Sequence, residues 1–361
     1  MNNRFLSTVK SLLRSFLIWL ALFLLMQLFA SNMNQNIALA LLAYIMSKVV
    51  YTVYWHFSPK EFITELEDKA ILITGCDTGF GNQFAEIMDK KGITVYAGCL
   101  FPEGEGAAQL RKTCSNRLKI LKMDVTNDEQ VQNAVQTVSS SLGNKKLWAV
   151  VNVAGIAYCG EIEWSPIETC TKTVEVNAIG PFRVTQAFLP LLRRSQGRVV
   201  TIASILGRVA VSTSGTYCMS KYAAVAFSEV LRYELMKWNI SVHSVEPFLY
   251  STNITDVKKT MIDVEKNWEA TPQEIRDDYG KDYLGKMKES VCLAISIKRP
   301  PSKTHEVLDA LEHATIGKNP KNRYVPGLVG ELWTWAGAIV PSDIYDLVNY
   351  FVFPNKVAMK K

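Results

Sequence analysis

The sequence lacks the residue clusters that metal centres, disulfide frameworks and nucleic-acid surfaces require. Its seven cysteines are scattered without a CxxC pair and its four histidines form no ligand pattern, so we expect reduced thiols and no metal site. The net charge of +6 is modest, and basic and acidic residues are interspersed except in the short tail Lys360-Lys361. Binding to nucleic acid needs a concentrated basic face, which this pattern does not provide.

Charge is also missing near the N-terminus, where residues 15–47 include no charged side chain. Two apolar runs, 16–30 and 37–55, approach the length of about 20 residues that a transmembrane helix needs. We therefore expect residues 1–60 to be a membrane anchor of one or two transmembrane helices, rather than a cleaved signal peptide. Lys48 lies inside the second run and weakens the case for a second span. The side of the membrane that carries the rest of the chain stays open.

From about residue 65, short apolar runs alternate with amphipathic helical stretches. This alternation predicts an α/β fold with a single Rossmann-like, doubly wound parallel sheet that carries helices on both faces. The expected strands are Ala70–Thr74, Ile93–Ala97, Leu118–Met123, Trp148–Asn152, Arg198–Ala203, Ile240–Val245 and a seventh near Arg323–Val325.

The pattern becomes less regular after the sixth strand. Residues 248–303 are charged and helical in character, and their position predicts a lid over a substrate pocket. A surface insertion without substrate contact is the alternative. Residues 327–361 are aromatic and apolar but are interrupted by charges and by Pro341, which favours a segment that associates with a membrane surface.

A glycine-rich turn follows the first expected strand and precedes a helix. It has the spacing TGxxxGxG, and its glycines allow the backbone to approach a pyrophosphate that the helix N-terminus stabilises. We therefore expect a dinucleotide site here. Its predicted residues are Thr74, Gly75, Asp77, Gly79, Phe80 and Gly81.

Further cofactor contacts are expected where later strands end. Asp124 can accept a hydrogen bond from an adenine amino group, and it can equally cap the following helix. Asn152 precedes a turn of small residues that leaves room for the cofactor. The predicted set is Asp124, Val125, Asn152, Ala154, Gly155, Pro247 and Thr252, together with Tyr217 and Lys221.

The choice between NAD and NADP depends on the end of the second strand. It reads Ala97-Gly98-Cys99-Leu100, with no Asp for a ribose hydroxyl and no Arg or Lys for a 2′-phosphate. Asp77 would repel such a phosphate if it faces the ribose. NAD is therefore favoured over NADP.

Three residues near the fifth strand match the needs of proton transfer at a carbonyl oxygen. Tyr217 and Lys221 are spaced i and i+4, so they share one helical face, and Ser204 ends the strand upstream. A lysine ammonium and a positive nicotinamide ring would favour the phenolate of Tyr217, while Ser204 would hold the substrate oxygen. The YxxxK pattern also occurs at Tyr44 and Tyr233, but only Tyr217 has this serine.

Asn177 lies in the middle of an expected helix, where asparagine is a mediocre helix former. Two interpretations remain open. The residue either marks a backbone kink with a water site that links Lys221 to solvent, or it is an exposed polar residue.

These motifs resemble the short-chain dehydrogenase/reductase family across about Asp68–Val325. The glycine loop resembles the branch that contains retinol, 3-hydroxybutyrate and 17-beta-hydroxysteroid dehydrogenases, and the chain is most similar to the estradiol-type members. The resemblance implies a catalytic domain at 65–326 with Asn177, Ser204, Tyr217 and Lys221 as its catalytic residues.

The resemblance also implies NAD, a steroid- or retinoid-like alcohol as substrate, an endoplasmic-reticulum membrane and a homodimer. Two departures from the family pattern stand out: Val153 replaces an asparagine and Phe248 replaces a glycine beside the expected nicotinamide position. Two alternatives remain, namely a 3-hydroxybutyrate dehydrogenase and a catalytically silent scaffold that keeps the fold.

Overall fold

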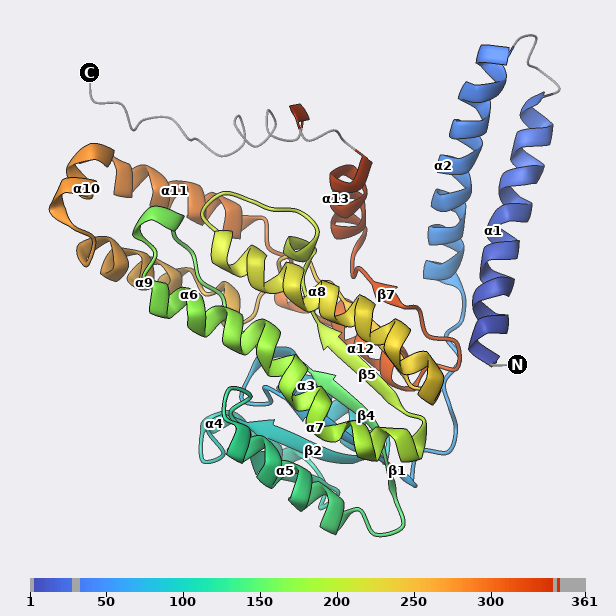
Figure 1. Cartoon of the computed structure of the whole chain (residues 1–361), viewed down its shortest axis with the longest axis horizontal. Coiled ribbons are helices and arrows are strands. Elements are labelled where there is room, and N and C mark those ends of the chain that lie inside the picture. Colours follow the sequence, from blue (N-terminus) through green and yellow to red (C-terminus); the bar gives the residue numbers. More distant parts are fainter. Residues whose placement is uncertain (1–2, 28–32, 340–342, 345–361) are drawn as a thin grey trace. The chain divides into compact units, whose positions relative to one another are not determined.

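The computed structural model describes residues 3–27, 33–339 and 343–344, and the chain divides into two compact units, 1–62 and 63–361. The first unit is a pair of antiparallel helices, α1 (Asn3–Gln27) and α2 (Met33–Phe57) (Figure 1). The indole N–H of Trp19 joins them by donating to the carbonyl oxygen of Ala40 at 3.2 Å. Within the described ranges no helix combines the length and the apolar character that crossing a bilayer requires. The expected transmembrane helices are thus not supported.

The second unit is built on a seven-stranded sheet in which every neighbouring pair is parallel. The strand order is β3-β2-β1-β4-β5-β6-β7, so the direction of winding reverses between β1 and β4. The prediction of a doubly wound parallel sheet is therefore confirmed. The strands are β1 (Lys69–Thr74), β2 (Thr94–Cys99), β3 (Leu118–Lys122), β4 (Lys146–Asn152), β5 (Arg198–Ile202), β6 (Ser241–Val245) and β7 (Arg323–Tyr324).

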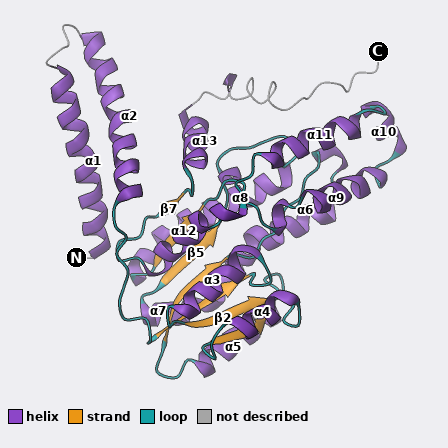
Figure 2. Cartoon of the chain, turned by 180° about the vertical axis from the view of Figure 1, so that it is seen from behind, coloured by secondary structure: helices purple, strands orange, loops and turns teal. Residues whose placement is uncertain are grey.

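Helices cover both faces of this sheet (Figure 2). The neighbouring helices α4, α3 and α12 form one layer, while α5, α7 and α8 belong to the other. The central strands are buried on both faces, which explains why they are continuous apolar runs. The helices are α3 (Gly79–Lys90), α4 (Glu105–Thr113), α5 (Asp128–Ser141), α6 (Ile167–Val174), α7 (Gly180–Ser195), α8 (Gly215–Leu235) and α12 (His305–Ile316).

Three further helices lie between β6 and α12: α9 (Val257–Glu269), α10 (Gln273–Tyr279) and α11 (Tyr283–Ser296). Together with Trp164 they share a small apolar core of their own, which includes Trp268 and Met287. The last described helix, α13 (Leu328–Ile339), follows β7. Residues 345–361 of the expected membrane-associating segment lie outside the described residues.

Single-turn segments complete the unit. They are the 3₁₀ turns Ile162–Trp164, Ile205–Gly207, Met236–Trp238, Asn253–Thr255 and Pro301–Lys303, and the π-helical turn Glu175–Ile179 between α6 and α7.

Candidate active site

A cavity of about 1240 Å³ opens at the carboxyl ends of the strands. Its walls include residues that follow β1 and β4, where the strand order reverses, and this is the place where open α/β sheets bind their ligands. All of the predicted site residues line this cavity except Thr74, Gly81, Asn152 and Asn177, which are buried.

The glycine loop has the backbone geometry that its sequence predicts. Gly75 and Gly79 have positive φ angles of 70° and 64°, a region that side chains with a Cβ atom rarely adopt. A Cβ atom on Gly81 would lie 2.3 Å from the carbonyl oxygen of Gly75. The start of α3 therefore packs directly against the end of β1, which leaves an open cradle for a phosphate at the helix N-terminus.

Thr74 and Asn152 shape the site from behind. The hydroxyl of Thr74 accepts hydrogen bonds from the backbone N–H groups of Val153 (3.0 Å) and Ala154 (3.1 Å), so it fixes the turn after β4. The amide of Asn152 donates to the hydroxyl of Thr185 at 3.0 Å. Through these bonds both residues hold the end of β4 and the turn that follows it, which forms part of the cavity wall.

Two aspartates lie at the nucleotide end. The carboxylate of Asp77 accepts from the backbone N–H groups of Leu100 (2.9 Å) and Phe101 (2.8 Å), so it closes the loop that follows β2. Asp124 accepts from the backbone and hydroxyl of Thr126. The expected alternative of a helix cap is wrong for Asp124, because Asn127 caps α5.

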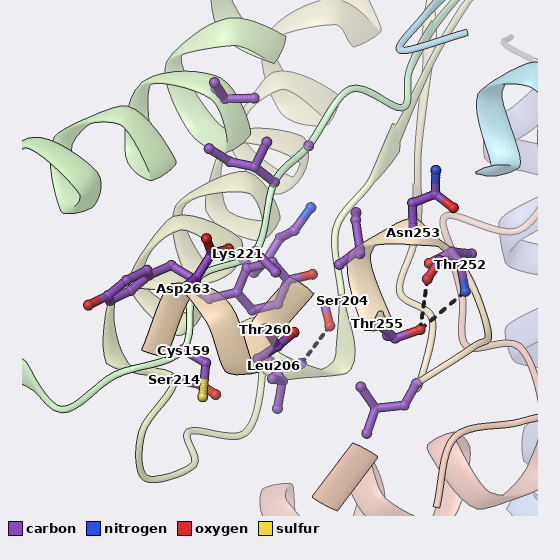
Figure 3. Close-up of a pocket in the computed structure, with 18 of the residues that line it drawn as sticks. Cys159, Ser204, Leu206, Ser214, Lys221, Thr252, Asn253, Thr255, Thr260 and Asp263 are labelled. Carbon is purple, nitrogen blue, oxygen red and sulfur yellow. Dashed lines mark hydrogen bonds between the residues drawn. The ribbon is translucent and has the colours of Figure 1, made fainter. Parts of the chain in front are cut away.

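The predicted chemical residues meet at the other end of the cavity (Figure 3). Ser204 follows β5, and its hydroxyl accepts from the backbone N–H of Leu206 at 3.1 Å. Tyr217 lies in the first turn of α8 and Lys221 lies one turn later. The ammonium of Lys221 is 5.6 Å from the Tyr217 ring centroid and donates to the carbonyl oxygen of Ile202 at 3.1 Å.

Burial controls the charge of this pair. Desolvation raises the pKa of Tyr217 to about 12, while its hydrogen bond with the Ser204 hydroxyl acts in the opposite direction. Desolvation lowers the pKa of Lys221 to about 8. Near neutral pH the phenol of Tyr217 is therefore protonated. The charged form of Lys221 is favoured over the neutral amine by only a small margin.

Asn177 is buried, so the interpretation as an exposed polar residue is wrong. It lies in the π-helical turn, and the predicted backbone irregularity at this position is present. Its amide accepts from the N–H of Ile156 (2.8 Å) and donates to the carbonyl of Ile156 (2.8 Å) and to the hydroxyl of Ser220 (3.0 Å). Ser220 in turn donates to the carbonyl oxygen of Tyr217 at 2.8 Å. Asn177 thus links the turn after β4 to α8, the helix that carries Tyr217 and Lys221.

Sequence reasoning did not identify Ser220, although it sits beside Lys221 inside the YxxxK pattern. It also did not identify the apolar side of the cavity as a set, because the contributing residues come from distant segments. Those segments are the 3₁₀ turn after β5, the chain after β6, α11 and α13. Their residues include Leu206, Phe248, Met287, Val291, Ile295 and Trp333.

Several known proteins are similar to this chain in sequence or in architecture. The short chain dehydrogenase family profile matches residues 69–263. Estradiol 17-beta-dehydrogenase 2 of Mus musculus is 36% identical over 315 residues, which cover 87% of this chain and 82% of that protein. The chain belongs to the short-chain dehydrogenase family. Mitochondrial D-beta-hydroxybutyrate dehydrogenase of Rattus norvegicus is 40% identical over 268 residues, covering 72% of this chain and 76% of that protein.

A solved structure agrees with the fold. A short chain dehydrogenase from Burkholderia cenocepacia, in complex with NADP, superposes with a TM-score of 0.59 at 22% identity and covers 79% of this chain and 99% of its own. Family membership confirms the resemblance found in the sequence. This short-chain dehydrogenase is an NAD(P)-dependent oxidoreductase that acts on CH–OH groups and interconverts alcohols and carbonyl compounds.

Proposed function

We propose that this short-chain dehydrogenase uses NAD to oxidise a secondary alcohol on a steroid- or retinoid-like lipid. The observation that carries the proposal is that Tyr217, which is half-buried, and Lys221, which is buried, line the same cavity as Ser204 and the glycine loop. Asn177 and Ser220 hold the catalytic helix against the turn after β4.

The residues present fit a nicotinamide dinucleotide. The close approach of Gly81 to the carbonyl oxygen of Gly75 brings the N-terminus of α3 to the end of β1, where a pyrophosphate binds in doubly wound folds. Thr252 lines the same cavity and lies 3.9 Å from a Cβ atom placed on Gly79. The remaining cofactor contacts are proposed for Asp124, Val125, Ala154, Gly155 and Pro247, which line the cavity.

A nicotinamide dinucleotide held at the glycine loop would supply the acceptor for the hydride that leaves the carbinol carbon. The hydroxyl of Ser204 holds the substrate oxygen, and the phenolate of Tyr217 takes the proton from that oxygen. The ammonium of Lys221 stabilises the phenolate. In the reverse direction the neutral phenol of Tyr217 donates the proton to the carbonyl oxygen.

We propose NAD rather than NADP because of the position of Asp77. Its carboxylate is held by the N–H groups of Leu100 and Phe101, at the end of the second strand, where the adenine ribose binds in doubly wound folds. A 2′-phosphate placed there would meet a fixed negative charge.

The substrate proposal rests on the apolar wall near Ser204 and Tyr217. A small hydroxy acid is the second candidate, since Lys259 and Lys286 line the cavity and could pair with a carboxylate. A silent scaffold is not favoured, because the three chemical residues are intact and meet in one cavity. Purified enzyme supplied with NAD and a panel of hydroxysteroids, retinol and 3-hydroxybutyrate separates these cases by the rate of NADH formation. No NADH with any of them would contradict the proposal.

We also propose that the N-terminal unit holds the enzyme at the endoplasmic-reticulum membrane. Large apolar side chains of α1 and α2 are exposed, among them Leu17, Leu25 and Leu41. Burial of such side chains in lipid is favourable. Fractionation of cells that express the full chain, followed by extraction with salt, carbonate and detergent, tests this proposal. Release by salt alone would contradict it.

Two copies of the chain are proposed to pair through α7 and α8. Phe182 and Val230 on these helices are half exposed, and Phe182 packs against Phe227 with ring centroids 5.9 Å apart. A Val230→Glu variant should shift the sedimentation of the purified protein from dimer to monomer. An unchanged dimer would exclude this face.

A further inference from the structure

The cavity beside the catalytic serine carries an aromatic side chain where the family pattern has glycine. Phe248 follows Pro247, whose carbonyl oxygen accepts from the backbone N–H of Ile205 at 3.1 Å and from the hydroxyl of Ser204 at 3.5 Å. Phe248 is therefore fixed next to the residue that is proposed to hold the substrate oxygen. Its side chain lines the cavity.

A second aromatic ring reaches the same place from the C-terminal helix. Trp333 of α13 lines the cavity, and its ring centroid is 6.4 Å from that of Phe248, with the two planes inclined at 45°. This spacing is within the range in which aromatic pairs attract each other. Phe248 and Trp333 together form what we call the aromatic wall.

Gly330 allows α13 to pack closely against Phe248. A Cβ atom on Gly330 would lie 3.3 Å from the Cβ atom of Phe248 and 3.6 Å from the side chain of Ile205. Because those contacts are already tight, a larger residue there would push the helix, and Trp333 with it, away from the cavity. The backbone of α13 is therefore matched to the presence of Phe248.

Other residues that line the cavity are also apolar. Leu206 comes from the turn after Ser204, while Met287, Val291 and Ile295 come from α11. The cavity also has charged lining residues: Lys259, Asp263 and Lys286 on α9 and α11, and Glu161, Glu168, Lys172 and Glu175 in and around α6. A substrate that fills the space beside Ser204 and Tyr217 thus meets rings and aliphatic groups.

Resting on the proposed function, we infer that Phe248 and Trp333 are specificity-determining residues that pack against the face of a rigid, polycyclic lipid alcohol. Flat rings give a large contact area with a fused hydrocarbon skeleton, and water leaves both surfaces on binding. A small hydroxy acid with its reacting carbon at Ser204 offers far less apolar surface to these rings than a fused skeleton does. The aromatic wall therefore favours a polycyclic alcohol over a small hydroxy acid.

The test compares Phe248→Ala, Trp333→Ala and the double variant with the wild-type enzyme. Each is assayed with a 17β-hydroxysteroid and with 3-hydroxybutyrate, and NAD affinity is measured separately by fluorescence titration. We expect the ratio of kcat/KM values, steroid over hydroxybutyrate, to fall roughly 10- to 100-fold in each single variant, mainly through KM for the steroid. Because the rings touch, the double variant should lose less than the product of the two single losses.

Two further variants separate packing from folding. Trp333→Phe keeps a ring and should restore most of the ratio, whereas Trp238→Ala removes an exposed tryptophan that stacks on Arg193 outside the cavity and should leave the ratio unchanged. Equal losses for both substrates, or a ratio that does not move, would overturn the inference. Wild-type enzyme that forms no NADH with hydroxysteroids, retinol or 3-hydroxybutyrate would instead refute the proposed function.

Discussion

The carboxylate of Asp77 in the glycine loop accepts a hydrogen bond from the backbone N–H of Leu100, 2.9 Å away at the end of β2. The two residues belong to different strand–helix connections, and the bond joins the loop after β1 to the loop after β2, which are proposed to face the pyrophosphate and the ribose. The bond holds the carboxylate of Asp77 beside the end of β2. The end of β2 itself has neither an acidic nor a basic residue.

Asp77→Asn should relax the choice of cofactor. The variant removes the fixed charge but keeps an oxygen that can accept from one N–H group, so we expect NADP to gain about 10-fold in affinity relative to NAD. Titration of both dinucleotides measures this ratio. Glu103→Gln, which neutralises an exposed carboxylate close to the same loop, is the matched control and should leave the ratio unchanged. If Asp77→Asn also left the ratio of NADP to NAD affinity unchanged, Asp77 would have no part in cofactor selection.

Tyr217→Phe should lose turnover and retain cofactor binding. The phenol supplies or accepts the proton at the substrate oxygen, and its loss is expected to lower kcat by about 10³-fold or more, because general acid–base catalysis contributes 10²–10⁴-fold. NADH formation and NAD titration measure the two properties separately. Tyr233→Phe removes the hydroxyl of the exposed YxxxK tyrosine on the same helix and should turn over normally. Comparable losses in the two variants would remove Tyr217 from its proposed role.

The oxidation rate should increase with pH. Burial raises the pKa of Tyr217 to about 12, and the hydrogen bond with Ser204 acts against this shift. We expect the positive charges of Lys221 and of bound NAD to lower the pKa further. Below the resulting pKa only a fraction of the enzyme holds the phenolate, so kcat/KM for alcohol oxidation should rise about 10-fold per pH unit. Carbonyl reduction, which needs the neutral phenol, should fall above that pKa. A flat profile in both directions would mean that another group transfers the proton.

Lys221→Met should stabilise the cofactor-free protein while it reduces activity. Burial lowers the pKa of this lysine from 10.5 to about 8, so folding is opposed by the cost of an ammonium that only water solvates well. That cost is fully present below pH 8 and declines as the pH rises toward 10.5, because the unfolded chain then loses its proton too. We expect a gain of about 1–3 kcal/mol in the free energy of unfolding at pH 7 and a smaller gain at pH 10.

Denaturant unfolding at the two pH values measures this difference. Lys237→Met, which changes the lysine of the Tyr233 pair, is the control and should have little effect at either pH. A destabilised Lys221→Met variant would show that the hydrogen bond to Ile202 outweighs the burial of charge.

The sequence predicted the sheet and most of the cavity because both depend on local patterns. Buried parallel strands are apolar runs, and the glycine loop and the Ser204–Tyr217–Lys221 spacing are short-range features. Strand boundaries moved by one or two residues; β2 starts at Thr94 because Ile93 still bonds to Met88 at the end of α3.

The missed parts are contacts between distant segments. Trp333 meets Phe248 from a helix far along the chain, and the reach of Asp77 to Leu100 depends on how the loops after β1 and β2 pack. Neither contact has a period or a spacing that a sequence pattern displays. The expected transmembrane helices rested on apolar length alone, and within the described residues neither helix meets the requirement for a span.

The hydroxyl of Thr74 has a consequence for how the enzyme matures. It bonds to Val153 and Ala154, about eighty positions later in the chain, so the nucleotide pocket is incomplete until the middle of the protein has been synthesised and β4 has docked beside β1. We therefore expect the dinucleotide to bind only chains in which β4 has docked beside β1. The binding energy of the dinucleotide consequently adds to the stability of the whole catalytic unit, in proportion to the logarithm of its concentration.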